Sequence, residues 1–167
     1  FGFPLIEGWA MTETGSGVCF LSQKEPRHVG NRCIGQVTTD MEIKIVGDNG
    51  DKVETGMAGE LLVRRKGANI KYGFFTEYYK NPESTAEVWQ NDWFHTGDVV
   101  SQNEEGSVFF VERKKNIIRR SGENIAAAEV ETVLIDNPLV ANCAVTPLPD
   151  PIREEEVAAC IVLNDEY

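Results

Sequence analysis

Residues 41–45 alternate apolar and polar side chains with a period of two, in the order Met41-Glu42-Ile43-Lys44-Ile45. This alternation indicates a strand with one buried face. A turn is expected at residues 47–51, because their Asn and Gly tolerate positive φ. A second strand follows at residues 59–64, read as Gly-Glu-Leu-Leu-Val-Arg. We therefore expect antiparallel sheet over residues 40–65, within a small barrel or sandwich.

Further elements are expected on both sides of this pair. Residues 1–30 are rich in Gly, Ser and Thr, which predicts loops with one short strand. A helix is expected to begin at Asn81-Pro82, because Pro is tolerated in a first helical turn. Residues 93–98 form an aromatic strand that runs into a turn at Gly97. Residues 103–106 then form a hairpin turn that leads to a strand over 108–111.

The composition changes sharply at residues 113–120, which hold five basic residues and no acidic one. A helix is expected over 126–136, ended by Asn137-Pro138. Its predicted buried face consists of Ala126, Val130, Val133 and Leu134. Strands at 142–146 and 157–163 follow, separated by a Pro-rich turn at 147–151. The last third is therefore expected to be α+β, with a domain boundary near residues 112–115.

The overall composition excludes several classes of protein. The 167 residues carry 16 Lys and Arg against 27 Asp and Glu, a net charge of −11, which argues against a general nucleic-acid binder. Hydrophobic residues at 41% and charged residues at 26% are typical of a folded domain. No apolar run approaches the roughly 18 residues of a membrane helix. The isolated histidines, His28 and His95, are expected to be structural.

The four cysteines are widely spaced along the chain, at Cys19, Cys33, Cys143 and Cys160. No two of them form a C-x-x-C pair. This spacing predicts reduced thiols in an intracellular protein, rather than a zinc site or a disulfide scaffold.

A first candidate site lies within residues 7–15, where small residues let the backbone approach a ligand closely. Thr12 and Thr14 offer hydroxyls, Glu13 offers a hard oxygen suited to Mg²⁺, and Trp9 offers a flat face for a base. Taken alone, the same residues also fit a polar turn with a buried Trp.

Two further candidates lie downstream. The Asp98 carboxylate follows Thr96-Gly97 and could accept two hydrogen bonds from a ribose diol, although Gly-Asp is also a common turn. Arg113 begins the basic run and could bind phosphate as a fork donor. A solvated charged strand around residues 117–118, or a nucleic-acid patch, would give the same composition.

Together these clusters resemble the adenylate-forming acyl-CoA synthetase family, which also contains luciferases and peptide-synthetase adenylation domains. The resemblance covers nearly the whole chain, in four blocks that match in order and spacing. They are residues 8–13 (G-W-A-M-T-E), 59–63 with 78–85 (G-E-L-L-V and Y-Y-K-N-P-E-S-T), 93–98 (W-F-H-T-G-D) and 113–125 (R-K-K-N-I-I-R-R-S-G-E-N-I).

The resemblance implies a mainly β fold of the α+β class. A distorted β-barrel subdomain would end the large N-terminal domain within residues 1–112. Residues 113–167 would be the hinge and the first part of a small, mobile α+β C-terminal domain. Because the family's upstream phosphate loop and its final lysine segment do not occur in the sequence, we expect a piece of a longer protein. The 167 residues alone are expected not to catalyse ATP–pyrophosphate exchange.

The family reaction has two steps, and the resemblance implies ATP, Mg²⁺, CoA and a small carboxylic acid in a cytoplasmic enzyme. The acid attacks ATP to give an acyl-adenylate and pyrophosphate, and a thiol then displaces AMP. Gly8, Trp9 and Ala10 would line the nucleotide, with Trp9 stacked on adenine. Thr12 and Glu13 would be catalytic, Thr12 by bonding phosphate and Glu13 by holding Mg²⁺.

The remaining implied roles lie downstream. Asp98 would bind the ribose hydroxyls, joined by Arg113, and Lys115 would be the hinge. Arg119 and Gly122 would serve the thioester step, with Gly122 letting the backbone approach the pantetheine arm. Two departures, Ala10 for Gly and Trp9 for Tyr, affect the acyl pocket and the polar tip of the stacking ring.

Residues 122–131 resemble those of fatty-acid and carnitine/crotonobetaine–CoA ligases. Two alternatives stay open at this point: a peptide-synthetase-type adenylation domain that loads a carrier protein, and a non-catalytic module of the same fold. A nucleic-acid binder, suggested only by the basic run, is the least favoured.

Overall fold

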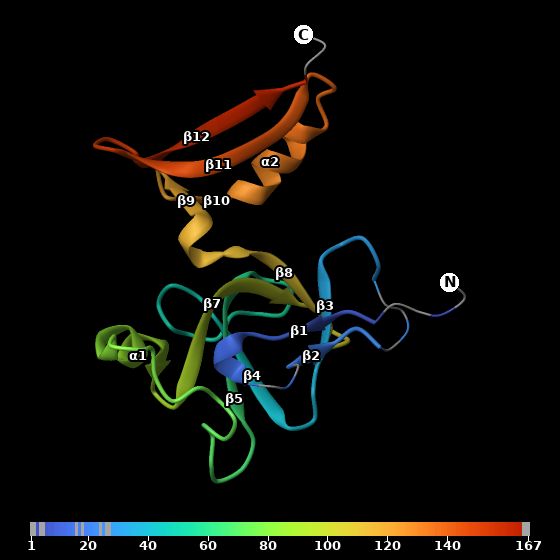
Figure 1. Cartoon of the computed structure of the whole chain (residues 1–167), viewed down its shortest axis with the longest axis vertical. Coiled ribbons are helices and arrows are strands. Elements are labelled where there is room, and N and C mark those ends of the chain that lie inside the picture. Colours follow the sequence, from blue (N-terminus) through green and yellow to red (C-terminus); the bar gives the residue numbers. More distant parts are fainter. Residues whose placement is uncertain are drawn as a thin grey trace. The chain divides into compact units, whose positions relative to one another are not determined.

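The computed structural model describes residues 3, 6–15, 17, 19–23, 25 and 28–164. The chain divides into two compact units, Phe1–Val111 and Glu112–Tyr167. Antiparallel strands dominate both units, so the expectation of a mainly β, α+β fold is confirmed (Figure 1). None of the helices in the described part of the chain is long and apolar enough to cross a membrane.

The first unit is built on one antiparallel sheet with the order β1-β2-β3-β8-β7-β5-β4 (Figure 1). Its strands are β1 (Gly8–Trp9), β2 (Phe20–Leu21), β3 (Cys33–Val37), β4 (Met41–Val46), β5 (Gly59–Arg65), β7 (Trp93–Gln102) and β8 (Val108–Arg113), with β6 (Trp89–Gln90) paired to β7. Among the described residues no ladder joins β1 to β4. The expected distorted barrel is therefore an open sheet.

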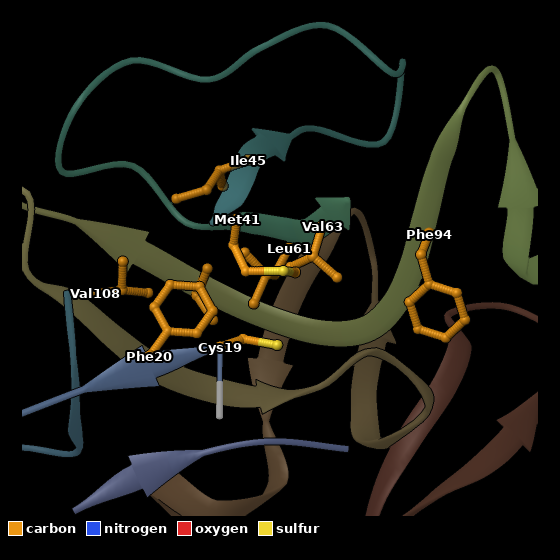
Figure 2. Packing of buried hydrophobic residues seen from close by; sticks show 9 residues of the cluster. Cys19, Phe20, Met41, Ile45, Leu61, Val63, Phe94 and Val108 are labelled. Atoms are coloured by element: carbon orange, nitrogen blue, oxygen red, sulfur yellow. The ribbon is translucent and has the colours of Figure 1, made fainter. Parts of the chain in front are cut away.

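The core of this unit forms where the alternating strands place apolar residues on one face. Met41 and Ile45 from β4 meet Leu61 and Val63 from β5 (Figure 2). The cluster is completed by Cys19, Phe20, Phe94, Val100 and Val108. Period-two alternation predicted β4, whose Met41 and Ile45 are buried in this core. The strand expected at residues 59–64 is also present, as β5.

The strand β7 is longer than predicted, because Gly97 does not end it. Gly97 has a φ of +70° inside the strand, and the pairing of β5 with β7 shifts register between Glu60 and Leu62. This is a β-bulge, which glycine permits because it has no Cβ to clash at positive φ. The predicted turn at Gly97 is therefore wrong, and the strand continues to Gln102.

The strand β3 was missed because its central residue is a glycine. Gly35 has a φ of +95°, and a Cβ there would lie 2.1 Å from the backbone of Leu21. Close approach of β2 to β3 thus requires glycine, whose presence weakens the sequence signal for a strand. The described part of residues 1–30 contains two short strands, β1 and β2, where one was expected.

The short helix α1 (Pro82–Val88) begins as predicted. Asn81 is its N-cap, and its side-chain oxygen accepts a hydrogen bond of 3.1 Å from the Ser84 amide. The 3-10 helix η1 (Thr12–Thr14) follows β1 after Ala10 and Met11.

The second unit is a four-stranded sheet of order β10-β9-β12-β11 with the helix α2 (Ala127–Ile135) against β11 (Figure 1). Its strands are β9 (Ile117–Arg120), β10 (Glu123–Ala126), β11 (Val140–Asp150) and β12 (Glu154–Leu163), and the 3-10 helix η2 (Lys114–Asn116) precedes them. Ser121 and Gly122 join β9 to β10 with φ values of +52° and +83°, as a two-residue hairpin turn requires.

Two sequence predictions fail in this unit. Pro147 and Pro149 lie within β11 rather than in a turn. They are tolerated because β11 is an edge strand, where a missing N–H breaks no ladder. On α2, Val133 is 73% exposed instead of buried. The buried face of the helix consists of Ala127, Val130 and Leu134.

Candidate functional site

The first two candidate motifs meet through a hydrogen bond between residues 89 positions apart. The indole Nε1 of Trp9 donates to Oδ2 of Asp98 at 3.0 Å. The Trp9 ring also packs edge-on against Phe20, with ring centroids 5.3 Å apart. Trp9 is therefore held at both its ring and its N–H. Its expected stacking on adenine stays a prediction.

Asp98 is placed by the bulge in β7. The backbone N–H of Asp98 donates to Thr96 Oγ1 at 3.0 Å, and that hydroxyl donates to the Leu61 carbonyl at 2.7 Å. The Asp98 side chain is 1% exposed. A carboxylate so fully removed from water requires hydrogen-bond donors, one of which is the Trp9 indole.

Glu13 lies on η1 and is held twice by one segment of chain. The phenol of Tyr78 donates to Glu13 Oε1 at 2.9 Å, and the Phe75 amide donates to the Glu13 carbonyl at 2.9 Å. Glu13 was predicted from the sequence as a metal ligand. In the sequence, Tyr78 belongs to the block at residues 78–85, and no local pattern there indicates its contact with Glu13.

The loop after η1 is packed against a glycine. Gly15 has a φ of +81°, and a Cβ there would lie 1.9 Å from the Gly73 carbonyl oxygen. Thr14 is buried, and its hydroxyl donates to the Met11 carbonyl at 2.9 Å. These contacts fix the backbone that carries Thr12 and Glu13.

The cysteine behind β1 is unsuited to nucleophilic chemistry. The Cys19 amide donates to the Trp9 carbonyl at 2.9 Å, and the side chain is fully buried. Burial raises the pKa of the Cys19 thiol above its ordinary value, although a hydrogen bond with Thr14 and the charge of Arg65 act against it. The thiol therefore stays protonated and serves as packing.

The residues of the first unit fit a nucleotide and a divalent cation. Gly8, Ala10 and Thr12 are exposed on the loop beside Trp9, where their small side chains and hydroxyl suit a ligand. Glu13 is half-buried and its carboxylate is oriented by Tyr78. Mg²⁺ usually binds through one or two carboxylates together with substrate phosphates, which Glu13 suits.

The other predicted site residues belong to the second unit. Arg113, Lys115 and Arg119 are exposed, and the Arg119 amide donates to Glu155 Oε2 at 2.7 Å. Gly122 is exposed in its turn, and a Cβ there would meet no atom within 4 Å. That these residues act together with the candidate site of the first unit stays a prediction.

A buried carboxylate at the start of this unit was missed by sequence reasoning. Glu112 is 5% exposed and accepts hydrogen bonds from the Arg113 amide at 2.8 Å, the Asn116 side chain at 3.3 Å and the Ala128 amide at 2.9 Å. It thus caps α2 from a distance, since the N-cap residue Ala126 makes no side-chain cap. The partners on α2 give no local signal in the sequence.

Two protein-family models match parts of this chain. The model of the AMP-binding enzyme family matches residues 1–75, and that of the AMP-binding enzyme C-terminal domain matches residues 129–167. The crotonobetaine/carnitine–CoA ligase of Escherichia coli O127:H6 is 36% identical over 166 residues, which cover 99% of this chain and 31% of the ligase.

Solved structures of similar fold include a CoA synthetase and an amide bond synthetase. The o-succinylbenzoate CoA synthetase MenE from Bacillus subtilis, in complex with the acyl-adenylate OSB-AMP, matches with a TM-score of 0.81 and 29% identity over 98% of this chain and 32% of that one. The same synthetase with ATP and magnesium ion gives a TM-score of 0.77, 29% identity and coverage of 97% and 32%. The amide bond synthetase McbA from Marinactinospora thermotolerans gives 0.73, with 27% identity and coverage of 97% and 32%. The chain spans about a third of the length of these relatives.

Proposed function

The chain belongs to the family of AMP-binding, adenylate-forming enzymes, and from this membership we propose that its enzyme is an AMP-forming carboxylate–CoA ligase. A carboxylate oxygen of the acid attacks the α-phosphorus of ATP. The bond between the α-phosphorus and the bridging oxygen breaks, and pyrophosphate leaves with the electron pair. The product is an acyl-adenylate.

In the second step the CoA sulfur attacks the acyl carbonyl carbon. The bond from that carbon to the AMP oxygen breaks, AMP leaves with the electron pair, and the thiol proton passes to solvent. An acyl-CoA thioester results. In both steps positioning and charge neutralisation lower the barrier more than covalent catalysis by the protein does.

In this proposal the first unit binds the nucleotide. The Asp98 carboxylate would accept hydrogen bonds from the ribose hydroxyls while Trp9 holds its Oδ2. Because Asp98 is buried, the side chains that cover it would have to move aside when the nucleotide binds. The Thr12 hydroxyl donates to a phosphate oxygen, and Gly8 and Ala10 let the backbone approach. Glu13 would hold Mg²⁺, which when bound neutralises phosphate charge.

The second unit contributes the residues that change between the two steps. Arg113 would join Asp98 at the ribose, and Lys115 would be the hinge. Arg119 and the Gly122 turn would face the pantetheine arm, where the absence of a Cβ at Gly122 leaves room. Rotation of the second unit about the hinge would let one cleft present two sets of groups in turn.

The observation that carries the proposal is the Trp9–Asp98 hydrogen bond, because it unites two motifs 89 residues apart at one place. The relatives' names favour CoA as the acceptor over a carrier protein. A cytoplasmic location is part of the proposal, since ATP and CoA are available there and the four cysteines are free thiols.

The test is ATP–pyrophosphate exchange by the full-length enzyme that carries this chain, with short, medium and long carboxylic acids and carnitine-type acids. We expect exchange with one of these classes and its loss in Asp98→Ala, while Asp92→Ala, an exposed turn residue, leaves exchange unchanged. The chain alone should show none. CoA, a carrier protein and an amine are then offered as acceptors, with CoA thioester expected. Exchange with amino acids only, or amide as the only product, would contradict the proposal.

A further inference from the structure

We propose that Tyr78 is a positioning residue for Glu13, and that its phenol sets the strength of Mg²⁺-dependent ATP binding. This inference rests on the proposed function, which gives Glu13 the role of holding the cation. The structural basis is the hydrogen bond of 2.9 Å from Tyr78 Oη to Glu13 Oε1, across 65 residues of chain.

Residue 13 is fixed at both its backbone and its side chain by the same short segment. The Phe75 amide donates to the Glu13 carbonyl at 2.9 Å, three residues before the phenol that reaches the carboxylate. A Glu side chain otherwise loses rotamer entropy when it is ordered. Because Tyr78 already orders this carboxylate, less entropy remains to be lost when a cation binds.

Tyr78 is itself held firmly enough to act as a guide. Its ring packs against Phe75 with centroids 4.7 Å apart, and Phe75 packs against the core residue Phe94 at 6.1 Å. Its amide donates to Thr85 Oγ1 at 3.0 Å, and its carbonyl accepts from the amide of Asn81, the N-cap of α1. The phenol therefore projects from a helix cap onto η1.

The chemistry of the pair suits an anion that holds a cation. A phenol can only donate to an ionised carboxylate, and bonds to charged acceptors are stronger than bonds to neutral ones. The bond orients Oε1 of Glu13, while a carboxylate still has lone pairs for a second partner. The neighbouring tyrosine provides a comparison, since Tyr79 is 85% exposed.

The experiment compares Tyr78→Phe with Tyr79→Phe in the full-length enzyme that carries this chain. Calorimetry measures the affinity for ATP with Mg²⁺, for ATP with EDTA, and for AMP. We expect Tyr78→Phe to weaken the Mg²⁺-dependent gain in ATP affinity about tenfold, as for one hydrogen bond to a charged group. AMP affinity and the melting temperature should stay within twofold and about 2 °C of wild type. Tyr79→Phe should match wild type in every measurement.

A double-mutant cycle with Glu13→Gln distinguishes positioning from a general structural effect. If Tyr78 acts through Glu13, Tyr78→Phe has no further effect on the Mg²⁺-dependent gain in the Glu13→Gln background. Thr85→Ala, which removes the acceptor of the Tyr78 amide and keeps the phenol, should give a smaller loss in the same measurement, and it replaces Tyr78→Phe if that variant does not fold.

Two results overturn the inference. One is an equal loss of AMP and Mg²⁺–ATP affinity in Tyr78→Phe, and the other is full additivity with Glu13→Gln. Either result leaves nucleotide binding by the wild-type enzyme intact. Failure of the proposed function would appear differently, as absence of ATP and AMP binding in the wild type itself.

Discussion

Trp9 Nε1 lies 3.0 Å from Asp98 Oδ2 and donates a hydrogen bond to it. The donor lies at the end of the two-residue strand β1, and the acceptor lies just after the bulge at Gly97 in β7. Of the two groups, Asp98 is buried and Trp9 is half-buried. The indole N–H of Trp9 therefore orients the Asp98 carboxylate, independently of any stacking by the ring.

Replacing Trp9 by Phe keeps an aromatic face and removes the N–H. We expect AMP affinity of the full-length enzyme to fall about tenfold or more, because a hydrogen bond to a charged acceptor contributes roughly 1.5–3 kcal/mol. Calorimetric titration with AMP measures the loss. Trp93→Phe is the control, since that ring lies under Arg64 instead of beside Asp98. Equal affinities for Trp9→Phe and wild type would show that only the ring matters.

Gly15 and Gly50 have similar φ values of +81° and +79° but different surroundings. Ala at Gly50 meets no atom within 4 Å, so only backbone strain of about 1–2 kcal/mol is expected. Ala at Gly15 would also place a Cβ 1.9 Å from the Gly73 carbonyl oxygen, so η1 or its neighbour must shift. Urea denaturation should show a loss for Gly15→Ala at least twice that for Gly50→Ala. Equal losses of unfolding free energy in the two variants would mean that the backbone near Gly73 shifts at no cost.

Glu112 links the start of the second unit to α2. Glu112→Ala leaves the partly buried amides of Arg113 and Ala128 without this acceptor, which should cost about 2–4 kcal/mol of folding free energy. Glu112→Gln, which keeps one acceptor oxygen, should cost less. Hydrogen exchange at the Ala128 amide reports the change, and Glu104→Ala in an exposed turn is the control. Unchanged exchange in Glu112→Ala would contradict the capping role.

The pH dependence of the second unit should follow Glu156. Hydrogen bonding from Arg120, with a further contribution from Arg153, lowers the pKa of the Glu156 carboxyl below its ordinary value of 4.5. A group whose pKa falls on folding stabilises the fold above its unfolded pKa, and that stabilisation disappears as the pH drops through the folded pKa. The stability of wild type should therefore fall below about pH 4.5, and Glu156→Gln should flatten this fall. Denaturation between pH 3 and 6 measures it, with Glu104→Gln as the control. A slope unchanged by Glu156→Gln would assign the acid sensitivity to other carboxylates.

Local patterns predicted the elements whose side chains alternate or cap. Met41–Val46 and the Asn81 cap of α1 needed only neighbouring residues for their interpretation, and both are confirmed. Gly97 and Pro147 were wrongly predicted to lie in turns, where Gly and Pro are common, because each lies within a strand. A bulge accommodates Gly97, and an edge strand accommodates Pro147. Neither a bulge nor a sheet edge can be recognised before the strands are paired.

In the candidate site, too, local motifs could be recognised from the sequence and long-range contacts could not. Residues 8–13 and Asp98 were predicted from short motifs, because the hydroxyl, carboxylate and aromatic groups that suit a ligand lie within each motif itself. The bonds from Trp9 to Asp98 and from Tyr78 to Glu13 join residues 89 and 65 positions apart. No periodicity encodes such pairs. They follow from how β1, β7 and the segment before α1 pack.

A crystal structure of the full-length enzyme with AMP bound tests the proposed nucleotide site most directly. We expect the ribose hydroxyls within hydrogen-bond distance of the Asp98 carboxylate, with Trp9 Nε1 still bonded to Oδ2 and Thr12 at the phosphate. AMP bound away from Asp98, or a Trp9 indole that leaves the carboxylate in the complex, would contradict it.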